Sequence, residues 1–233
     1  MKDEFYFDEE TADKSVRFIE TYLTHTKGEL AKTPFILQEY QKEQIIKPLF
    51  GWKRKDGSRK YRTAFIFLPR KNGKSTLAAA IILTLMYLDE GFGNEYYSAA
   101  NDKEQAKLVF DCARVMIENN PKLSQFVEIF KSSIVYNTKG TYYKAISRES
   151  STKHGFNTSA FIYDELFDKF SACYKMYNYA CKVRDGVIED DQFLPVIFEA
   201  EEDDDIQDPK TWAKANPGLG VSLKSEYMKR EAA

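Results

Sequence analysis

The residues with the clearest chemical potential form the loop Leu68-Pro-Arg-Lys-Asn-Gly-Lys-Ser-Thr76. An apolar, β-prone segment (64–68) leads into it, and an Ala- and Leu-rich segment (77–88) with a helical pattern follows. The order strand, loop, helix is the context that a phosphate-binding loop requires. In that context backbone N–H groups of the loop and of the first helical turn face an anion, and the helix dipole adds to the attraction. The sequence therefore predicts a phosphate site here.

Three residues of the loop have distinct expected tasks. Gly73 lets the backbone approach a phosphate, Lys74 supplies a point charge for the β and γ oxygens, and Ser75 can offer its hydroxyl to Mg²⁺. The usual pattern begins with a glycine, whereas this chain has Leu68 followed by Pro69. Since Gly-Lys-Ser alone is common, a plain strand-to-helix turn with a solvated lysine stays open at this point.

A second chemical pair comes about ninety residues later, where the apolar run Ala160-Phe-Ile-Tyr163 ends in Asp164 and Glu165. A buried parallel strand that ends in two carboxylates suits the other half of a nucleotide site, because ligands bind at the carboxyl ends of such strands. Asp164 would hold Mg²⁺, and Glu165 would orient and polarise the attacking water. The alternative is an ordinary strand followed by a helix start, which favours acidic residues.

The loop and four further stretches resemble, in order, the large terminase subunit of tailed bacteriophages of the HK97 type, an ATP-driven motor that packages DNA into proheads. The further stretches are Phe35-Ile-Leu-Gln-Glu-Tyr-Gln41, Ser98-Ala-Ala-Asn-Asp-Lys-Glu-Gln-Ala106, Ile162-Tyr-Asp-Glu-Leu166 and Trp212-Ala-Lys-Ala-Asn-Pro-Gly-Leu-Gly220. The resemblance covers nearly the whole chain, and the combination is far more specific than any one motif.

The resemblance implies an Mg-ATPase with ATP and Mg²⁺ as cofactors. It assigns nucleotide binding to Gln41, Arg70, Lys71, Asn72, Gly73, Lys74, Ser75 and Thr76. It assigns metal binding to Ser75 and Asp164, and catalysis to Glu165 and Arg70. Gln41 matches the glutamine that reads the adenine edge, and Arg148 is a candidate for an arginine that reaches a neighbouring subunit's nucleotide.

The implied partners are double-stranded phage DNA, the small terminase subunit and the portal protein. The resemblance further implies a homo-oligomer on the portal, a monomer when free, no membrane association, and a location in the host bacterial cytoplasm. The net charge of −2 gives no global attraction to nucleic acid, so any DNA contact must be local. The basic segment 51–62 is expected to form a hairpin around Asp56-Gly57, either solvated or touching a phosphate backbone.

The expected fold class is α/β, a P-loop NTPase of the RecA or helicase-like type with a mostly parallel sheet flanked by helices and small helical additions. We expect an N-terminal helical segment with the adenine-side motif (1–50), the ATPase core (51–170) and a C-terminal helical and linker segment (171–233). The 233 residues suffice for one good core. The acidic run 199–208 is expected to be a solvated linker rather than a metal site.

The chain departs from the family after Leu166, where a helix followed by a core strand that couples hydrolysis to movement is expected. A helical pattern at 174–187 follows almost at once instead, so we expect an internal deletion of several dozen residues. We also expect no nuclease domain in the chain. Turnover is therefore in doubt, and two alternatives stay open: a non-hydrolysing nucleotide-binding protein that contacts packaging partners, and another P-loop helicase-like ATPase or nucleotide kinase.

Composition narrows the class of protein further. A hydrophobic fraction of 43% and an aromatic fraction of 15% are typical of a folded globular protein. The three cysteines have no metal-ligand spacing and suggest no disulfide framework, which favours a reducing compartment. No apolar run reaches transmembrane length without charges, and the N-terminal residues lack the pattern of a signal peptide.

Overall fold

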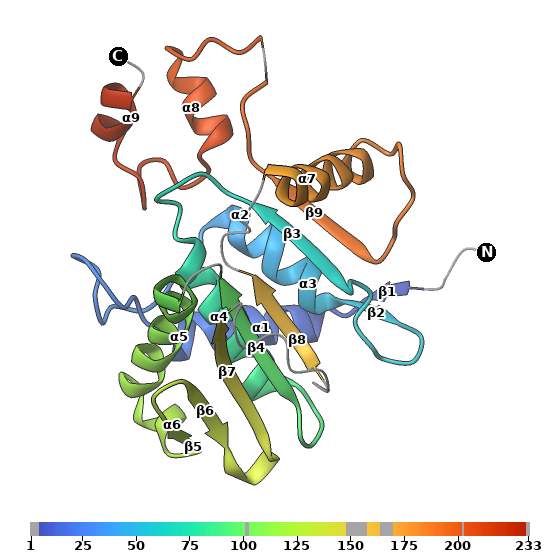
Figure 1. The fold of residues 1–233 in the computed structure, drawn as a ribbon, viewed down its shortest axis with the longest axis vertical. Helices are drawn as coiled ribbons and strands as arrows, with labels where there is room; N and C mark the ends of the chain where they lie inside the picture. Colours follow the sequence, from blue (N-terminus) through green and yellow to red (C-terminus); the bar gives the residue numbers. More distant parts are fainter. Residues whose placement is uncertain (1–4, 101–102, 148–157, 164–169, 202, 232–233) are drawn as a thin grey trace. The chain divides into compact units, whose positions relative to one another are not determined.

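The computed structural model describes residues 5–100, 103–147, 158–163, 170–201 and 203–231 (Figure 1). The chain divides into two compact units. The first unit comprises Met1–Asp13, Gln38–Lys74 and Tyr174–Ala233, and the second comprises Lys14–Leu37 and Ser75–Cys173. None of the described helices is long and apolar enough to cross a membrane.

The first unit contains two small sheets and most of the short helices. Its elements are β1 Phe5–Phe7, α2 Glu39–Gln41, the π-helix Lys42–Ile46, α3 Lys47–Gly51, β2 Trp52–Arg54, β3 Thr63–Phe67, most of α7 Phe170–Arg184, β9 Phe193–Ile197, α8 Pro209–Ala215 and α9 Ser225–Glu231. Strand β1 pairs antiparallel with β2, and β3 pairs in parallel with β9 from Thr63↔Phe193 to Phe67↔Ile197. The predicted strand before the loop is therefore confirmed as β3.

The second unit is built on a five-stranded sheet. Its elements are most of α1 Glu9–Tyr22, α4 Lys74–Leu88, β4 Glu95–Ala100, α5 Lys103–Glu118, α6 Pro121–Ser124, β5 Val127–Ile129, β6 Ser133–Tyr136, the 3₁₀ turn Asn137–Lys139, β7 Thr141–Ser147 and β8 Thr158–Tyr163. The strand order is β5-β6-β7-β4-β8, with β7, β4 and β8 mutually parallel and β5-β6-β7 antiparallel. The α/β class with mostly parallel central strands is confirmed.

Helix α4 owes its position to its composition. From Leu77 to Met86 nearly every side chain is buried, because the sequence is apolar on all sides and lacks the polar face of a surface helix. Its C-terminal end is capped from the hairpin turn: Lys139 Nζ donates to the carbonyl oxygens of Tyr87 (2.9 Å) and Asp89 (3.0 Å). A cation at the negative end of a helix dipole stabilises that end.

Strand β4 forms the centre of the second unit's core. Tyr96, Tyr97 and Ser98 are each at most 1% exposed. The buried hydroxyls have partners: Ser98 Oγ and Tyr143 Oη lie 2.7 Å apart, and Tyr97 Oη and Tyr142 Oη lie 2.6 Å apart. Burial raises the pKa of Tyr97 above its ordinary value, so this hydroxyl stays neutral.

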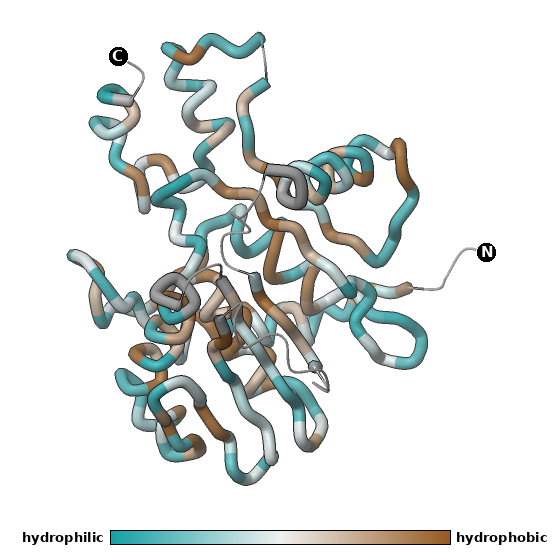
Figure 2. The backbone as a smooth tube through the Cα atoms, in the orientation of Figure 1, coloured by the Kyte–Doolittle hydropathy of each residue, from teal (hydrophilic) through white to brown (hydrophobic). Residues whose placement is uncertain are grey.

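Several short-range sequence signals have the local structure that they are typical of. Asp8 caps α1 through a bond from Thr11 N to its Oδ1 (3.0 Å), and Asp208 caps α8 through a bond from Lys210 N (2.8 Å). The basic hairpin turns at Gly57, whose φ is +81°, and Arg54 N donates to Ser58 O across the turn (2.8 Å). Figure 2 shows this loop as a hydrophilic stretch between β2 and β3.

Candidate functional site

The predicted phosphate loop lies between β3 and α4, as the strand–loop–helix pattern requires (Figure 1). Strand β3 ends at Phe67, and α4 begins with Lys74. Two residues of the loop have left-handed backbone conformations: Lys71 with φ +66° and Gly73 with φ +73°. A Cβ added at Gly73 would meet nothing within 4 Å, so the backbone there is open to an approaching ligand.

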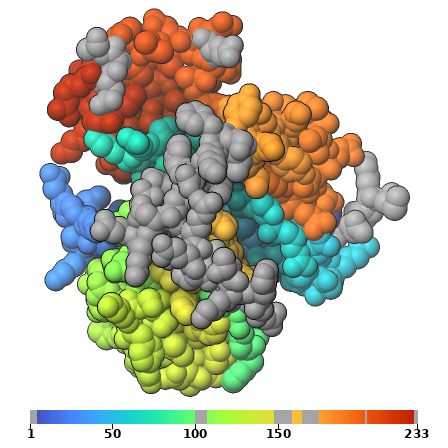
Figure 3. Space-filling model, in the orientation of Figure 1, coloured from blue at the N-terminus to red at the C-terminus, as the bar shows by residue number. Residues whose placement is uncertain are grey.

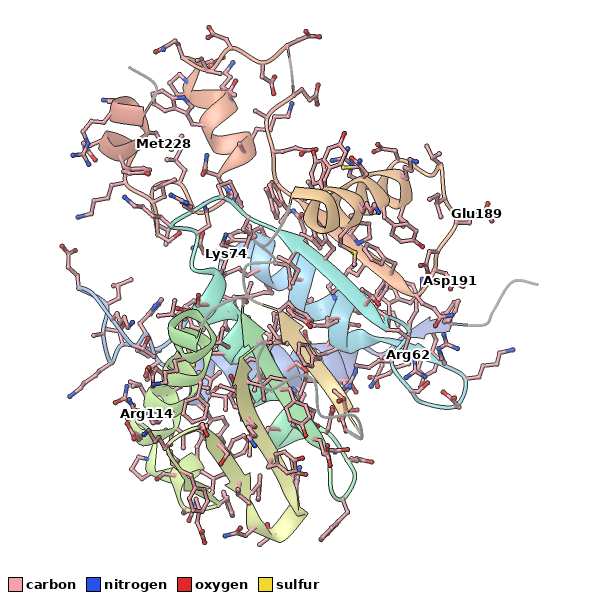
Figure 4. All side chains as sticks on the ribbon, in the orientation of Figure 1. Arg62, Lys74, Arg114, Glu189, Asp191 and Met228 are labelled. Atoms are coloured by element: carbon pink, nitrogen blue, oxygen red, sulfur yellow. The ribbon has the colours of Figure 1, made fainter. Side chains whose placement is uncertain are left out.

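The predicted phosphate-binding cations differ in their surroundings. Arg70 and Lys71 are exposed, whereas Lys74 is half-buried at the start of α4, where Figure 4 labels it. Within the described part of the chain, the Lys74 ammonium forms no hydrogen bond or ion pair with a protein group. Lys71 Nζ instead lies 3.3 Å from the centre of the Tyr227 ring, a cation–π contact. Lys74 is thus the cation best placed to meet an anion at the loop.

Ser75 and Thr76 follow in the first turn of α4 and are half-buried. A first-turn hydroxyl beside a phosphate loop is a suitable Mg²⁺ ligand, because Mg²⁺ takes few protein oxygens and completes its shell with phosphate and water. Among the described residues, no three His, Cys, Asp or Glu side chains are gathered in a way that could hold a metal ion. In the described chain the fit to Mg²⁺ therefore rests on the Ser75 hydroxyl, and its metal-binding role stays a prediction.

The predicted adenine reader, Gln41, is 2% exposed and already engaged within the chain. Its Oε1 accepts from Gln38 N (3.0 Å), and its Nε2 donates to Tyr40 Oη (3.3 Å). Tyr40 Oη donates in turn to the carbonyl oxygen of Asn72 in the loop (3.3 Å). Gln41 thus connects with the phosphate loop through Tyr40, and its contact with adenine stays a prediction.

Tyr40 and Gln41 lie where the backbone changes its helical geometry. The π-helix Lys42–Ile46 follows Gln41 directly, and short π segments inside helices are frequent at functional sites. The Tyr40 ring packs edge-on against Phe198 at 5.2 Å, and burial raises the pKa of its hydroxyl. The sequence did not predict a role for Tyr40. Its position next to the predicted adenine reader Gln41 could have suggested one.

Asn72 behaves differently from its neighbours in the loop, since its side chain is fully buried. The amide Nδ2 donates to Asn216 Oδ1 (3.3 Å), and Oδ1 accepts from Gly218 N (2.9 Å). The pattern Asn216-Pro-Gly218 is typical of a turn, but it gives no sign of a contact 146 residues away. The side chain of Asn72 is therefore fastened to protein, and its backbone N–H remains the group predicted to bind nucleotide.

The predicted carboxylates Asp164 and Glu165 and the candidate Arg148 lie outside the described residues. The strand that leads to the carboxylates is described: β8 runs from Thr158 to Tyr163, which confirms the predicted element. Within the described residues β8 pairs only with β4, and β3 pairs only with β9. Both strands that carry the predicted chemistry are thus edge strands of their described sheets.

A cavity of about 550 Å³ opens beside the loop within the first unit. It is lined by Lys71 and by residues between Ser222 and Arg230, including Lys224 and Tyr227. Figure 4 labels Met228 on α9, the helix that carries part of this lining. The lining carries the cations of Lys71, Lys224 and Arg230, the ring of Tyr227 and the carboxylate of Glu226. The cations suit an anionic ligand, and the ring suits a flat group.

The acidic run 199–208 was predicted to be a solvated linker, and three of its carboxylates, those of Glu199, Glu201 and Asp204, pair with cations. Lys214 Nζ lies 2.8 Å from both Glu201 Oε1 and Asp204 Oδ2, and this contact holds the pKa of Asp204 below its ordinary value. Glu199 accepts from Arg184 (2.7 Å) and from the Tyr177 hydroxyl, which raises the pKa of Tyr177. Four of these residues, Arg184, Glu199, Glu201 and Lys214, line a second cavity of about 390 Å³ and form ion pairs with one another.

Comparison with known proteins agrees with this arrangement. A sequence model of the terminase large subunit ATPase domain matches residues 39–200. The large terminase subunit of Enterobacteria phage HK97 is 27% identical over 94% of this chain and 49% of its own length. The large terminase subunit of Lactococcus phage p2 is 34% identical over 44% of this chain and 20% of its own length.

The fold is similar to a solved structure as well. The crystal structure of the HK97 bacteriophage large terminase matches with a TM-score of 0.79 and 25% identity, over 95% of this chain and 50% of that one. The chain thus spans about half the length of this relative. Because the family match includes the loop before α4 and strand β8, the chain belongs to the terminase large subunit ATPase domain family.

Proposed function

We propose that this chain binds ATP at the loop between β3 and α4 and that hydrolysis of the ATP serves the packaging of double-stranded phage DNA into proheads. The observation that carries the proposal is the placement of Lys74 at the N-terminus of α4, after a loop whose backbone is open at Gly73. Such a helix start attracts the β and γ phosphates through its N–H groups and its dipole.

Each residue has a separate task in this mechanism. The loop N–H groups and the Lys74 ammonium hold the phosphate oxygens, and Arg70 neutralises charge that develops on them. Ser75 and Asp164 would hold Mg²⁺, which would supply further positive charge to the phosphate oxygens. Glu165 orients the attacking water and accepts its proton.

The internal deletion inferred from the sequence would lower turnover more than binding. In its favour, β3 and β8 each have a single partner within the described residues, and both carry partly exposed aromatic side chains. Strands of a parallel sheet are normally covered on both edges and both faces. A missing strand beside β8 would leave the nucleotide ligands of the loop in place while weakening the link between hydrolysis and movement.

The single described partner of β3 and of β8 also favours a second candidate function. In this function the protein binds ATP without hydrolysing it and contacts packaging partners. The partners proposed for either function are double-stranded DNA, the small terminase subunit and the portal protein. The further proposals are a homo-oligomer on the portal, a monomer when free, and a location in the host bacterial cytoplasm. DNA-stimulated turnover separates the first function from the second.

The test compares the wild-type chain with Lys74→Ala and Glu165→Ala for MgATP binding and for hydrolysis, with and without duplex DNA. Lys74→Ala removes a charged contact with phosphate, so the affinity for MgATP should fall by roughly 30-fold, or about 2 kcal/mol. Glu165→Ala should retain binding and lose hydrolysis. Wild-type binding without turnover would favour the second function, and equal ATP binding by wild type and Lys74→Ala would contradict both.

A further inference from the structure

Both polar atoms of the Asn72 side chain form hydrogen bonds within the protein. Its Nδ2 donates to the carbonyl oxygens of Pro69 (3.3 Å) and Arg70 (3.2 Å) within the loop, and to Asn216 Oδ1 beyond it (3.3 Å). Its Oδ1 accepts from Gly218 N (2.9 Å). A buried amide normally has its polar groups satisfied, and here the partners join two distant segments of the chain.

The main chain at the same residue is held from a third segment. Tyr40 Oη donates to the carbonyl oxygen of Asn72 (3.3 Å), and the Tyr40 side chain is 7% exposed. Asn72 lies between Lys71 and Gly73, the two residues of the loop with positive φ. A non-glycine residue at positive φ is strained and persists where surrounding contacts over-determine it. The contacts of Asn72 supply that restraint at the centre of the loop.

The segment that bonds to Asn72 is itself held by hydrogen bonds and close packing. Asn216 is anchored to α8, since its N and its Nδ2 both donate to Trp212 O at 2.8 and 3.1 Å. Gly218 is packed so closely that a Cβ there would lie 2.7 Å from Asn72 Oδ1 and 2.2 Å from Ser222 Oγ. Figure 3 shows the teal loop against the red segment that follows α8. A larger residue at position 218 would displace Ser222 Oγ or Asn72 Oδ1 and so disturb this contact.

We propose that Asn216 and Gly218 are positioning residues for the phosphate loop and act through the side chain of Asn72. This fastening, called the loop clasp here, comprises Asn72, Asn216 and Gly218, and its role rests on the proposed ATP binding. The clasp holds the loop N–H groups in the conformation that meets phosphate. The loop therefore loses little conformational entropy when the nucleotide binds, and the affinity is higher. Neither Asn216 nor Gly218 needs to touch the nucleotide.

The first test is a double-variant cycle on the affinity for MgATP. Asn72→Ala should weaken binding by about tenfold, the equivalent of one buried amide's hydrogen bonds. Asn216→Ala should weaken it by a smaller factor, and the double variant should bind no more weakly than Asn72→Ala alone, because both act through one fastening. Unchanged affinity in the single variants, or losses that multiply in the double variant, would overturn the proposal.

The control is Asn119→Ala in the other unit. The Asn119 amide also makes a part-buried bond, to Thr24 Oγ1 at 2.9 Å, so its removal has a comparable structural cost. This variant should bind MgATP as the wild type does. A loss of affinity equal to that of Asn216→Ala would show that general destabilisation explains the effect and would overturn the positioning role.

The second test requires no nucleotide and follows trypsin cleavage after Arg70 and Lys71 by mass spectrometry. Without the clasp the loop opens more often, so Asn72→Ala and Asn216→Ala should be cleaved roughly fivefold faster than the wild type, and Asn119→Ala at the wild-type rate. Equal rates would overturn the clasp itself. A different outcome is that cleavage responds as expected but neither the wild type nor Lys74→Ala binds MgATP. In that case the clasp exists, but the proposed function and the positioning role are both overturned.

Discussion

Strands β4 and β3 are both parallel strands rich in aromatic residues, yet they are buried to very different extents. Strand β4 pairs with β7 on one side and β8 on the other, and Tyr96 and Tyr97 are at most 1% exposed. Strand β3 pairs only with β9 within the described residues, and its Phe67 is 37% exposed. Hydrophobic stabilisation scales with the apolar area removed from water, so β4 contributes far more to the stability of its unit.

The two regions also use their polar groups for different purposes. Around β4, hydroxyl pairs such as Ser98 with Tyr143 satisfy the polar atoms of a dense core. After β3, the bonds of Asn72 and Tyr40 fix the conformation of a loop. Substitutions near β4 should therefore lower the free energy of unfolding without changing the affinity for MgATP. Substitutions near the loop should mainly lower the affinity for MgATP.

The largest expected effect is the loss of the Tyr143 ring. Tyr143 is fully buried and packs against Phe110, with ring centres 5.7 Å apart. Tyr143→Ala should lower the free energy of unfolding by about 4 kcal/mol, since truncation of a buried aromatic leaves a cavity. Urea unfolding measures this change, and Phe67→Ala on β3 is the matched variant, with an expected loss of roughly 1 kcal/mol. An equal fall in the free energy of unfolding in both variants would contradict the claim that the core around β4 contributes more stability than β3.

A smaller effect isolates the hydroxyl pair from the packing. Tyr143→Phe leaves Ser98 Oγ buried without this partner, so the free energy of unfolding should fall by about 1–2 kcal/mol. Ser98→Ala in the same chain removes the orphaned group and should restore part of the loss, because removal of both partners is close to neutral. MgATP affinity should be the same in all these variants. A double variant less stable than either single one would contradict this account of the pair.

The sequence predicted the local elements well because their signals are local. The loop between an apolar strand and an apolar helix and the Asp56-Gly57 turn each depend on residues within a few positions of one another. The β6–β7 hairpin likewise joins two strands that are close in the sequence. Local propensity and tertiary structure agree at all of these positions.

The contacts that organise the candidate site could not be predicted in this way. The bond between Gly218 N and Asn72 joins residues 146 positions apart, and no periodicity or spacing encodes it. Gln41 was predicted to read adenine, but only the folded chain reveals that its amide meets Tyr40 and, through it, the loop. Long-range polar contacts depend on the arrangement of several elements at once, so a single sequence leaves them undetermined.

The smallest expected effect lies in the unit of β3, at the start of α1. Asp8 accepts bonds from Thr11 Oγ1 (2.6 Å) and Thr11 N (3.0 Å), and these bonds lower the pKa of its carboxyl. Because the folded pKa lies below the unfolded value, the carboxylate stabilises the fold above pH 4 or so, and this contribution disappears as the pH falls through the folded pKa. Asp8→Ala should therefore cost about 1 kcal/mol at pH 7.

The pH dependence of that difference is the sharper measurement. Urea unfolding of the wild type and Asp8→Ala should give stabilities that converge below pH 4, where the wild-type carboxyl becomes protonated. Asp8→Asn is the matched control, because asparagine caps a helix about as well as aspartate and does not titrate there. Its advantage over Asp8→Ala should stay constant with pH. A wild-type advantage that also stays constant down to pH 3 would show that the cap does not depend on the charge of Asp8.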